Sequence, residues 1–348
     1  MPPLSNLFRA GDAGHGGDAF GAPSIVCRPV ARGEIESALR LLLASENGSA
    51  SDEQVLDFLS FAVERKIDVN SIWVSATSDG QILWMLLPVV SAGRTMLLFT
   101  PGRVPRDTPV AAIADLVESV CAHFATRGTA LAQMLIDPND VEVIEQYTRC
   151  GFAKLAELVY LHRAAPKHVP QPPIPEGFRV ETYSPSNHAH FATAIKQSYT
   201  ASLDCPALNG LRDIEDVMAG HKCSGEFDPG MWYLMMQGDA PAAVLLLGRT
   251  HNDSLELVYL GLSPDVRGEG IGDWLMQLAL WRVAADRRGR LSLAVDSGNA
   301  PALALYYRHG MQQIGSRVAM LRDLRALTTN AAADKVKVQS VQQTAADR

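Results

Sequence analysis

The sequence predicts an α+β protein (mixed α/β) built from two similar domains in tandem. At 348 residues the chain is too long for one compact domain and suits two of about 150 residues. The same order of segments occurs twice: a strand, helical stretches, two or three consecutive strands, a long helix, a strand, a short helix and a last strand. These two bodies span residues 23–164 and 178–325.

The segments outside the two bodies have compositions typical of tails and linkers. Residues 1–22 are rich in Gly, Ala and Asp, and we expect them to be disordered. Residues 165–177 contain five prolines and read as a stiff linker between the domains. Residues 326–348 are polar with little periodicity, so we expect a loose tail.

The two bodies align best near their ends. In each, an aspartate precedes a tyrosine by ten residues, and a glycine follows that tyrosine by four. These residues are Asp137, Tyr147 and Gly151 in the first body, and Asp296, Tyr306 and Gly310 in the second. A repeat of this length indicates duplication of a whole domain.

Composition argues against several classes of protein. The formal net charge of −7 disfavours a nucleic-acid partner bound by bulk electrostatics. No apolar run reaches the roughly 18 residues of a membrane span, and the N-terminus lacks the basic start and apolar centre of a secretion signal. Five scattered cysteines suggest reduced thiols. We therefore expect a cytoplasmic protein without a membrane or nucleic-acid partner.

The strongest functional signal is a glycine-rich turn, Arg267–Gly272, between a strand at Leu255–Leu262 and a helix at Asp273–Arg287. A turn of this kind exposes unpaired backbone amides at the positive end of a helix, without side chains to obstruct a phosphate. It lacks the Gly-Lys-Ser/Thr ending of a Walker loop, and residues 263–266 separate it from the strand, unlike a Rossmann fingerprint. The turn is either a pyrophosphate cradle or an ordinary helix cap.

A second motif favours the cradle. After an apolar strand at Leu291–Val295 the chain resembles the GNAT superfamily of acyl-CoA-dependent N-acyltransferases. The signature Arg/Gln-x-x-Gly-x-Gly/Ala matches Arg267, Gly270 and Gly272, and the pattern Asn-x-x-Ala-x-x-Leu-Tyr-x-x-x-Gly-Phe matches Asn299, Ala302, Leu305, Tyr306 and Gly310, with Met311 in place of Phe. The resemblance implies two GNAT-like domains, each a twisted, mostly antiparallel sheet flanked by helices, with acetyl-CoA as co-substrate.

The first body departs from the signature. Its strand Met96–Thr100 leads into residues 101–109, which hold one glycine and three prolines, and proline has no N–H to offer a phosphate. We interpret residues 23–164 as a degenerate GNAT-like domain, in which Tyr147 is a packing residue. A tandem arrangement with an active C-terminal half resembles the mycothiol synthase family in architecture.

Acetyl transfer to an amine needs a base and an acid. An amine with a pKa of about 10.4 is almost wholly protonated at neutral pH. Glu256, the only acid in its strand, resembles the general-base glutamate of the histone acetyltransferase branch, acting directly or through water; alternatively it is a water-facing strand residue. Tyr306 would return a proton to the departing thiolate, or it is a core aromatic.

The resemblance also implies how the cofactor is held. The Arg267–Gly272 backbone would bind the CoA pyrophosphate, with the Arg267 side chain adding charge or bracing the loop. The strand would splay at its end, leaving the Leu262 amide to polarise the acyl carbonyl. The implied cofactor-binding residues are Leu260, Gly261, Leu262, Arg267, Gly268, Gly270, Ile271, Gly272, Asn299 and Ala302, with Arg287, Arg288 and Arg308 as candidates for the 3′-phosphate.

Two further constellations carry little weight. His221 and Cys223 could be two ligands of a metal, but no second pair accompanies them, so we expect no metal site. Cys205 could carry an acyl group, but no matching histidine is identifiable and direct transfer needs none.

These observations predict an N-acetyltransferase that transfers the acetyl group of acetyl-CoA to a primary amine of a small molecule or peptide. The C-terminal half would catalyse direct attack in a ternary complex, and the N-terminal half would shape the acceptor cleft or stabilise the assembly. Acceptor selectivity is expected around residues 198–230. The alternative is a non-catalytic acyl-CoA-binding sensor. Either protein is compatible with a homodimer.

Overall fold

The computed structural model describes residues 24–44, 48–250 and 253–327. The predicted tail 1–22 and all but two residues of the predicted tail 326–348 lie outside the described residues. The N-terminal half contains strands β1 (Ile25–Pro29), β2 (Trp73–Thr77), β3 (Ile82–Ser91), β4 (Thr95–Phe99), β5 (Leu131–Ile136) and β6 (Ala153–Ala164), and helices α1 (Ile35–Leu42), α2 (Asp52–Glu64), α3 (Val110–Ala125) and α4 (Val141–Arg149).

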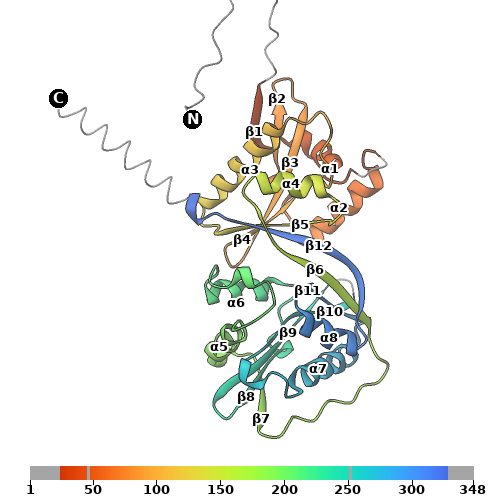
Figure 1. Ribbon diagram of the computed structural model, residues 1–348. Helices are drawn as coiled ribbons and strands as arrows, with labels where there is room; N and C mark the ends of the chain where they lie inside the picture. The colour runs from red at the N-terminus through yellow and green to blue at the C-terminus, as the bar shows by residue number, and fades with distance from the viewer. Residues whose placement is uncertain (1–23, 45–47, 251–252, 328–348) are drawn as a thin grey trace, which may run out of the picture.

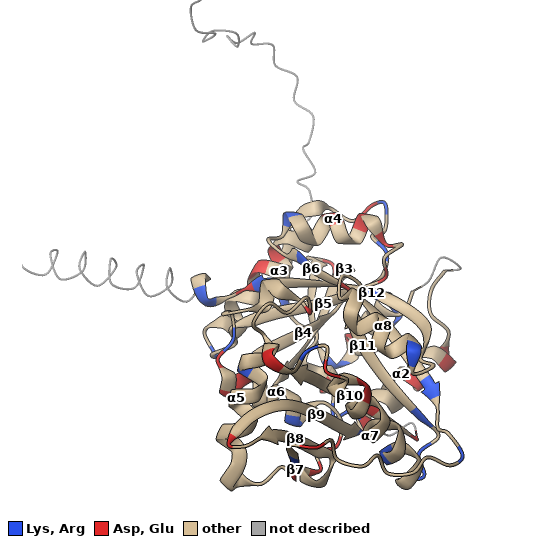
Figure 2. Ribbon diagram, turned by 60° about the horizontal axis from the view of Figure 1, so that its bottom comes forward, with Lys and Arg blue, Asp and Glu red and all other residues tan. Residues whose placement is uncertain are grey.

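The C-terminal half repeats this order of elements, as the sequence predicts. Its strands are β7 (Phe178–Thr182), β8 (Trp232–Gln237), β9 (Ala240–Arg249), β10 (Ser254–Leu262), β11 (Arg290–Asp296) and β12 (Gln312–Asp323), and its helices are α5 (His188–Ser198), α6 (Ile214–Cys223), α7 (Ile271–Ala285) and α8 (Ala300–Arg308). Within the described residues no helix is long and apolar enough to cross a membrane. Charged residues of both signs are distributed over both halves (Figure 2).

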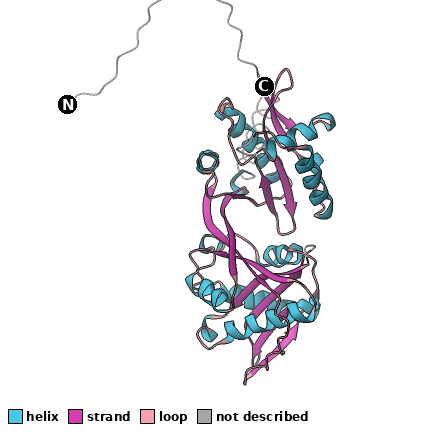
Figure 3. Ribbon diagram, turned by 90° about the vertical axis from the view of Figure 1, so that its right-hand side faces the viewer, coloured by secondary structure: helices cyan, strands magenta, loops and turns pink. Residues whose placement is uncertain are grey.

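The strands form one sheet in the order β1-β2-β3-β4-β5-β12-β6-β11-β10-β9-β8-β7. Neighbours are antiparallel except for the pairs β4–β5 and β10–β11, so the predicted mostly antiparallel α+β fold is confirmed. Helices cover both faces of the sheet (Figure 3). The long strands β6 and β12 cross between the two halves (Figure 1).

The last strand of each half joins the strands of the other half. β12 pairs with β5, and β6 pairs with β11, in matching registers: Leu131 faces Asp323 as Arg290 faces Ala164. The side chains follow the same symmetry, because Arg322 packs beside Gly151 and Arg163 packs beside Gly310. The halves are therefore bound by an exchange of equivalent strands.

In the C-terminal half the sheet lies between two helix layers. On one face, α7 and α8 pack on β9, β10 and β11 around Leu245, Leu257 and Leu275. On the other face, α5 and α6 pack around Phe191 and Trp232. The linker between the two halves contacts α7, because Trp274 Nε1 donates to the Pro173 carbonyl at 2.7 Å.

Candidate functional site

The site begins where two parallel strands separate. β10 pairs with β11 only through Ser254–Glu256, opposite Arg290–Ser292, while the rest of β10 stays paired with β9. A β-bulge between Leu257 and Tyr259 accompanies the separation. The predicted splay is thus present, and it opens a cavity of about 470 Å³.

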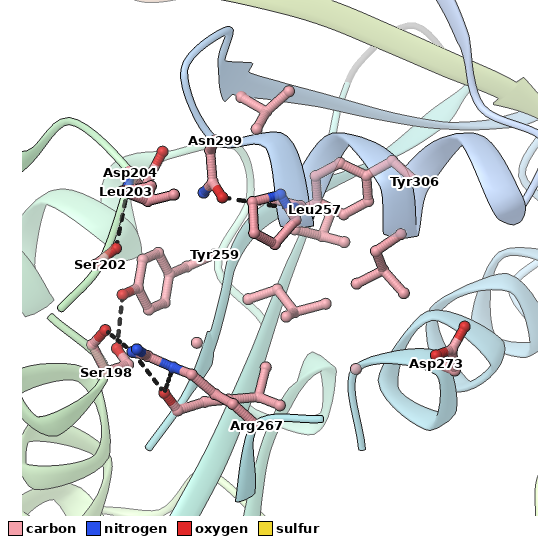
Figure 4. Close-up of a pocket in the computed structure, with 18 of the residues that line it drawn as sticks. Ser198, Ser202, Leu203, Asp204, Leu257, Tyr259, Arg267, Asp273, Asn299 and Tyr306 are labelled. Carbon is pink, nitrogen blue, oxygen red and sulfur yellow. Dashed lines mark hydrogen bonds between the residues drawn. The ribbon is translucent and has the colours of Figure 1, made fainter. Parts of the chain in front are cut away.

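The cavity collects most of the predicted cofactor-binding residues. Its lining comes from the C-terminal parts of β10 and β11, the turn before α7, helix α8 and the loop after α5 (Figure 4). Of the predicted residues it includes Leu260, Gly261, Leu262, Arg267, Gly268, Gly270, Gly272, Asn299, Ala302, Tyr306 and Arg308. The glycine-rich turn and the second motif therefore face one hollow.

The glycine-rich turn has the geometry of a helix N-terminus open to a ligand. Gly268 and Gly270 have φ of 83° and 81°, a left-handed conformation that disfavours other residues. Gly270 is the N-cap of α7, and its carbonyl accepts from Trp274 N at 3.0 Å. The amides between those two residues precede the first helical hydrogen bond, so they are unpaired within the helix. Ile271 supplies one of them, although its side chain lies in the core.

Arg267 braces the turn. Its guanidinium donates to the Ser198 carbonyl at 2.9 Å and to the Ala201 and Leu262 carbonyls at 3.3 Å. The side chain thus ties the end of α5 to the end of β10. Arg267 is expected either to add charge to the site or to brace the loop. The hydrogen bonds to backbone carbonyls are contacts of the bracing kind.

The amide of Leu262 faces the gap between β10 and β11. Ser263 N donates to Ala242 O on the β9 side at 2.8 Å. Main-chain groups of an antiparallel strand alternate in direction, so the groups of Leu262 point away from β9. The Arg267 hydrogen bond to Leu262 O agrees with this direction. A carbonyl oxygen lying in the gap would meet this N–H.

Asn299 starts α8 beside the cavity. Its Oδ1 accepts from Ala302 N at 3.3 Å and caps the helix, which leaves Nδ2 as its donor for a ligand. At the preceding turn, the carboxylate of Asp296 accepts from Gly298 N at 2.9 Å and from Cys205 N at 3.1 Å. The aspartate of the sequence repeat therefore fixes both the turn before α8 and the loop after α5.

Tyr306 and its counterpart Tyr147 differ in one respect. Tyr147 is wholly buried, and its hydroxyl is hydrogen-bonded to Trp84 Nε1 at 3.1 Å and to Thr100. The hydroxyl of Tyr306 has no hydrogen-bond partner within the described residues, and its ring lines the cavity. Burial raises the pKa of Tyr306, with Asp204 adding to the rise, so the phenol stays protonated. Only Tyr306 is available to a ligand.

Several predicted residues lie elsewhere. Glu256 does not line the cavity, and the bulge places it on the opposite face of β10 from Leu260. Burial raises the pKa of Glu256, and Arg65 partly opposes the rise. Arg287 and Arg288 follow the C-terminal end of α7 and do not line the cavity. Arg308 lines the cavity but is ion-paired with Asp273 at 2.9 Å.

Sequence reasoning missed Asp204. Asp204 is exposed at the rim of the cavity, yet enough protein surrounds its carboxyl group to raise the pKa, with Asp296 as the second cause. The next residue, Cys205, has a left-handed backbone with φ of 43°, and burial raises the pKa of its thiol to about 12. A protonated thiol is a poor nucleophile, whereas a carboxyl with a raised pKa can take up a proton.

The comparisons with known proteins agree with this geometry. Residues 201–311 match the sequence profile described as "Acetyltransferase (GNAT) family". The mycothiol acetyltransferase of Streptomyces bingchenggensis (strain BCW-1) is 31% identical over 146 residues, or 41% of this chain and 45% of the relative. The mycothiol acetyltransferase of Streptomyces griseus subsp. griseus is 26% identical over 163 residues, which cover 46% of this chain and 52% of that relative. The match spans about half the length of these curated relatives.

Two solved structures share the fold. A GCN5-related N-acetyltransferase from Sphaerobacter thermophilus superposes with a TM-score of 0.55 at 16% identity, over 86% of this chain and 96% of that chain. A glucosamine N-acetyltransferase region of a fungal multi-domain β-N-acetylglucosaminidase superposes with a TM-score of 0.56 at 13% identity, over 87% of this chain and 39% of that chain. Residues 201–311 are thus similar in sequence to the GNAT acetyltransferases, and the chain shares the fold of these two solved structures.

Proposed function

We propose that the protein is an N-acetyltransferase whose C-terminal half binds acetyl-CoA in the 470 Å³ cavity and acetylates a primary amine by direct attack in a ternary complex. One observation carries the proposal: the open N-terminus of α7 and the splayed end of β10 line a single cavity. A pyrophosphate binds at the N-terminus of α7, and a thioester carbonyl fits at the splayed end of β10.

Each cavity residue then has a chemical role. The backbone amides of the turn before α7 bind the pyrophosphate, and the Leu262 amide polarises the thioester carbonyl. The amine nitrogen bonds to the carbonyl carbon, the carbon–sulfur bond breaks, and the Tyr306 hydroxyl donates its proton to the departing sulfur. A carboxylate accepts the proton of the amine: Glu256 through a water, or Asp204, which lines the cavity.

The N-terminal half supports the loop that follows α5. Leu208 and Leu211 of that loop pack against Leu131 and Leu321 on strands β5 and β12. Arg325 donates to the Leu211 carbonyl at 3.1 Å. Since this loop supplies Asp204 to the cavity, its contact with Leu131 on β5 favours a role for the N-terminal half in shaping the acceptor side.

Calorimetry with acetyl-CoA, followed by a thiol-release assay with a panel of amines, tests the proposal. Gly272→Val places a branched side chain at the cradle, where a Cβ already lies 3.3 Å from Leu305, and should weaken acetyl-CoA binding about ten-fold or more. Gly33→Val, with open space around its Cβ, is the control. A sensor would give heat without turnover, and absence of heat with the unmodified protein would refute acetyl-CoA binding.

A further inference from the structure

A second cavity, of about 460 Å³, lies on the α5–α6 side of the same sheet. It shares Asp204, Val258 and Tyr259 with the first cavity, so the two hollows adjoin at the splayed strand. Apolar side chains from α5, α6 and the intervening loop form much of its wall, namely Tyr199, Leu208, Ile214 and Val217. The space is sufficient for a compact organic molecule whose reactive end reaches the first cavity.

One wall of this second cavity carries an unsatisfied polar group. His221 lines the cavity, and its Nε2 is shielded from solvent without a hydrogen-bond partner within the described residues. The ring packs on Tyr259 with centroids 5.1 Å apart. Burial, with a smaller effect of Arg212, lowers the pKa of His221 to about 4, so the imidazole is neutral. A buried nitrogen without a partner costs free energy that a bound ligand would recover.

The same cavity contains two cationic side chains, Lys196 and Arg212. Neither side chain forms an ion pair or hydrogen bond with another residue in the parts of the chain that the structure describes. Both line only the second cavity, whereas Asp204 borders both cavities. The remaining acid, Asp213, caps α6 by accepting from Glu215 N at 2.9 Å.

The acidic and basic side chains of the second cavity are arranged asymmetrically. The carboxylate of Asp204 stands where the two cavities meet, and the two cations without an ion-pair partner in the described residues line only the second cavity. A molecule with an amine at one end and an anion at the other would match the cavity in one orientation. That orientation presents its amine to the first cavity, where the thioester carbonyl would lie.

We propose that the second cavity binds the acetyl acceptor, and that this acceptor is a compact amino acid, an amine that also carries a carboxylate. Arg212 and Lys196 bind the carboxylate, and the His221 imidazole forms a further hydrogen bond to the acceptor. The proposal rests on the proposed acetyltransferase function and specifies its substrate class. A guanidinium and a carboxylate form the strong, charge-assisted hydrogen bonds that such selection requires.

Matched acceptors test the proposal in the thiol-release assay. The panel contains α-amino acids, β-alanine and γ-aminobutyrate, each beside its carboxamide, together with putrescine. We expect kcat/KM for the preferred acid to exceed that of its carboxamide by about ten-fold or more. Arg212→Gln should remove most of this preference and leave the KM for acetyl-CoA unchanged. Arg149→Gln, an exposed arginine of α4, should keep the preference.

The outcomes separate the two proposals. Equal or better turnover of carboxamides or putrescine, or a preference for acids that survives Arg212→Gln, overturns the acceptor assignment and leaves the acetyltransferase function intact. Acetyl-CoA binding without turnover of any acid also overturns the assignment. No heat with acetyl-CoA and no thiol release with any amine would refute the proposed function itself.

Discussion

Arg94 and Asp216 form an ion pair that joins the β3–β4 hairpin of the N-terminal half to α6, with Nη2 and Oδ2 2.6 Å apart. The contact is close, because a Cβ on Gly93 would lie 2.2 Å from the Asp216 carbonyl oxygen. Gly93 also has φ of 85°, which favours glycine. The hairpin therefore presses directly on the helix that carries His221.

Replacing this glycine should disturb the acceptor side. Gly93→Ala should lower the free energy of unfolding and raise the KM for the acceptor, while acetyl-CoA affinity stays unchanged. Gly80→Ala is the matched control, since φ is 92° and nothing lies near its Cβ. The control should cost about 1–2 kcal/mol from backbone strain, and Gly93→Ala about 1–3 kcal/mol more. Equal costs in denaturant titrations would show that the hairpin contact contributes little.

The two equivalent tyrosines should respond in opposite ways to loss of the hydroxyl. Tyr306→Phe should lower kcat by about a hundred-fold, as expected for loss of a general acid, with little change in stability. Tyr147→Phe should lower the free energy of unfolding by about 1–3 kcal/mol, because it leaves the buried Trp84 Nε1 without its acceptor, and should leave kcat unchanged. Full activity of Tyr306→Phe would remove the proton-donor role.

A pH profile distinguishes the two candidate bases. Burial raises the pKa of both Glu256 and Asp204, and a base works only when deprotonated, so activity should fall as the pH drops through the raised pKa. Substituting the true base, by Glu256→Gln or Asp204→Asn, should lower kcat/KM and abolish this acidic limb. The other substitution should keep the limb. If both variants keep it, neither carboxylate is the base.

His221 should make stability depend on pH. Its pKa of about 4 in the folded protein lies below the ordinary value of 6.5 for histidine, so between these pH values the unfolded chain binds a proton that the folded protein does not. Stability should therefore decrease on acidification from pH 6.5 to 4, by up to about 3 kcal/mol. Denaturant titrations of His221→Gln should show a shallower decrease over that range. Parallel curves for the two proteins would contradict the buried neutral imidazole.

The sequence predicted the residues that line the first cavity better than those that line the second. The turn at Arg267–Gly272 and the Asn299 motif are local patterns whose geometry follows from short-range backbone rules, and the structure brings them together. Asp204 and His221 belong to segments without a periodic pattern, and only tertiary packing brings them to one wall. The position of Glu256 was predicted from its offset from Arg267 along the chain. That offset contains no sign of the bulge at Val258, which puts Glu256 and Leu260 on opposite faces of β10.

The strand order likewise lay beyond prediction from sequence. The repeat identifies β6 and β12 as equivalent last strands, but equivalent strands have equivalent pairing preferences, so each could complete either half. Pairing between segments so distant in the chain leaves no local signal.

The exchange of β6 and β12 between the two halves also limits which parts of the chain can be deleted. Deleting the first half would remove β6, the neighbour of β11, and expose the edge of β11. The N-terminal half therefore completes the sheet of its neighbour whether or not it binds a ligand of its own. Truncation of the gene at the linker would consequently be expected to destabilise the half that remains.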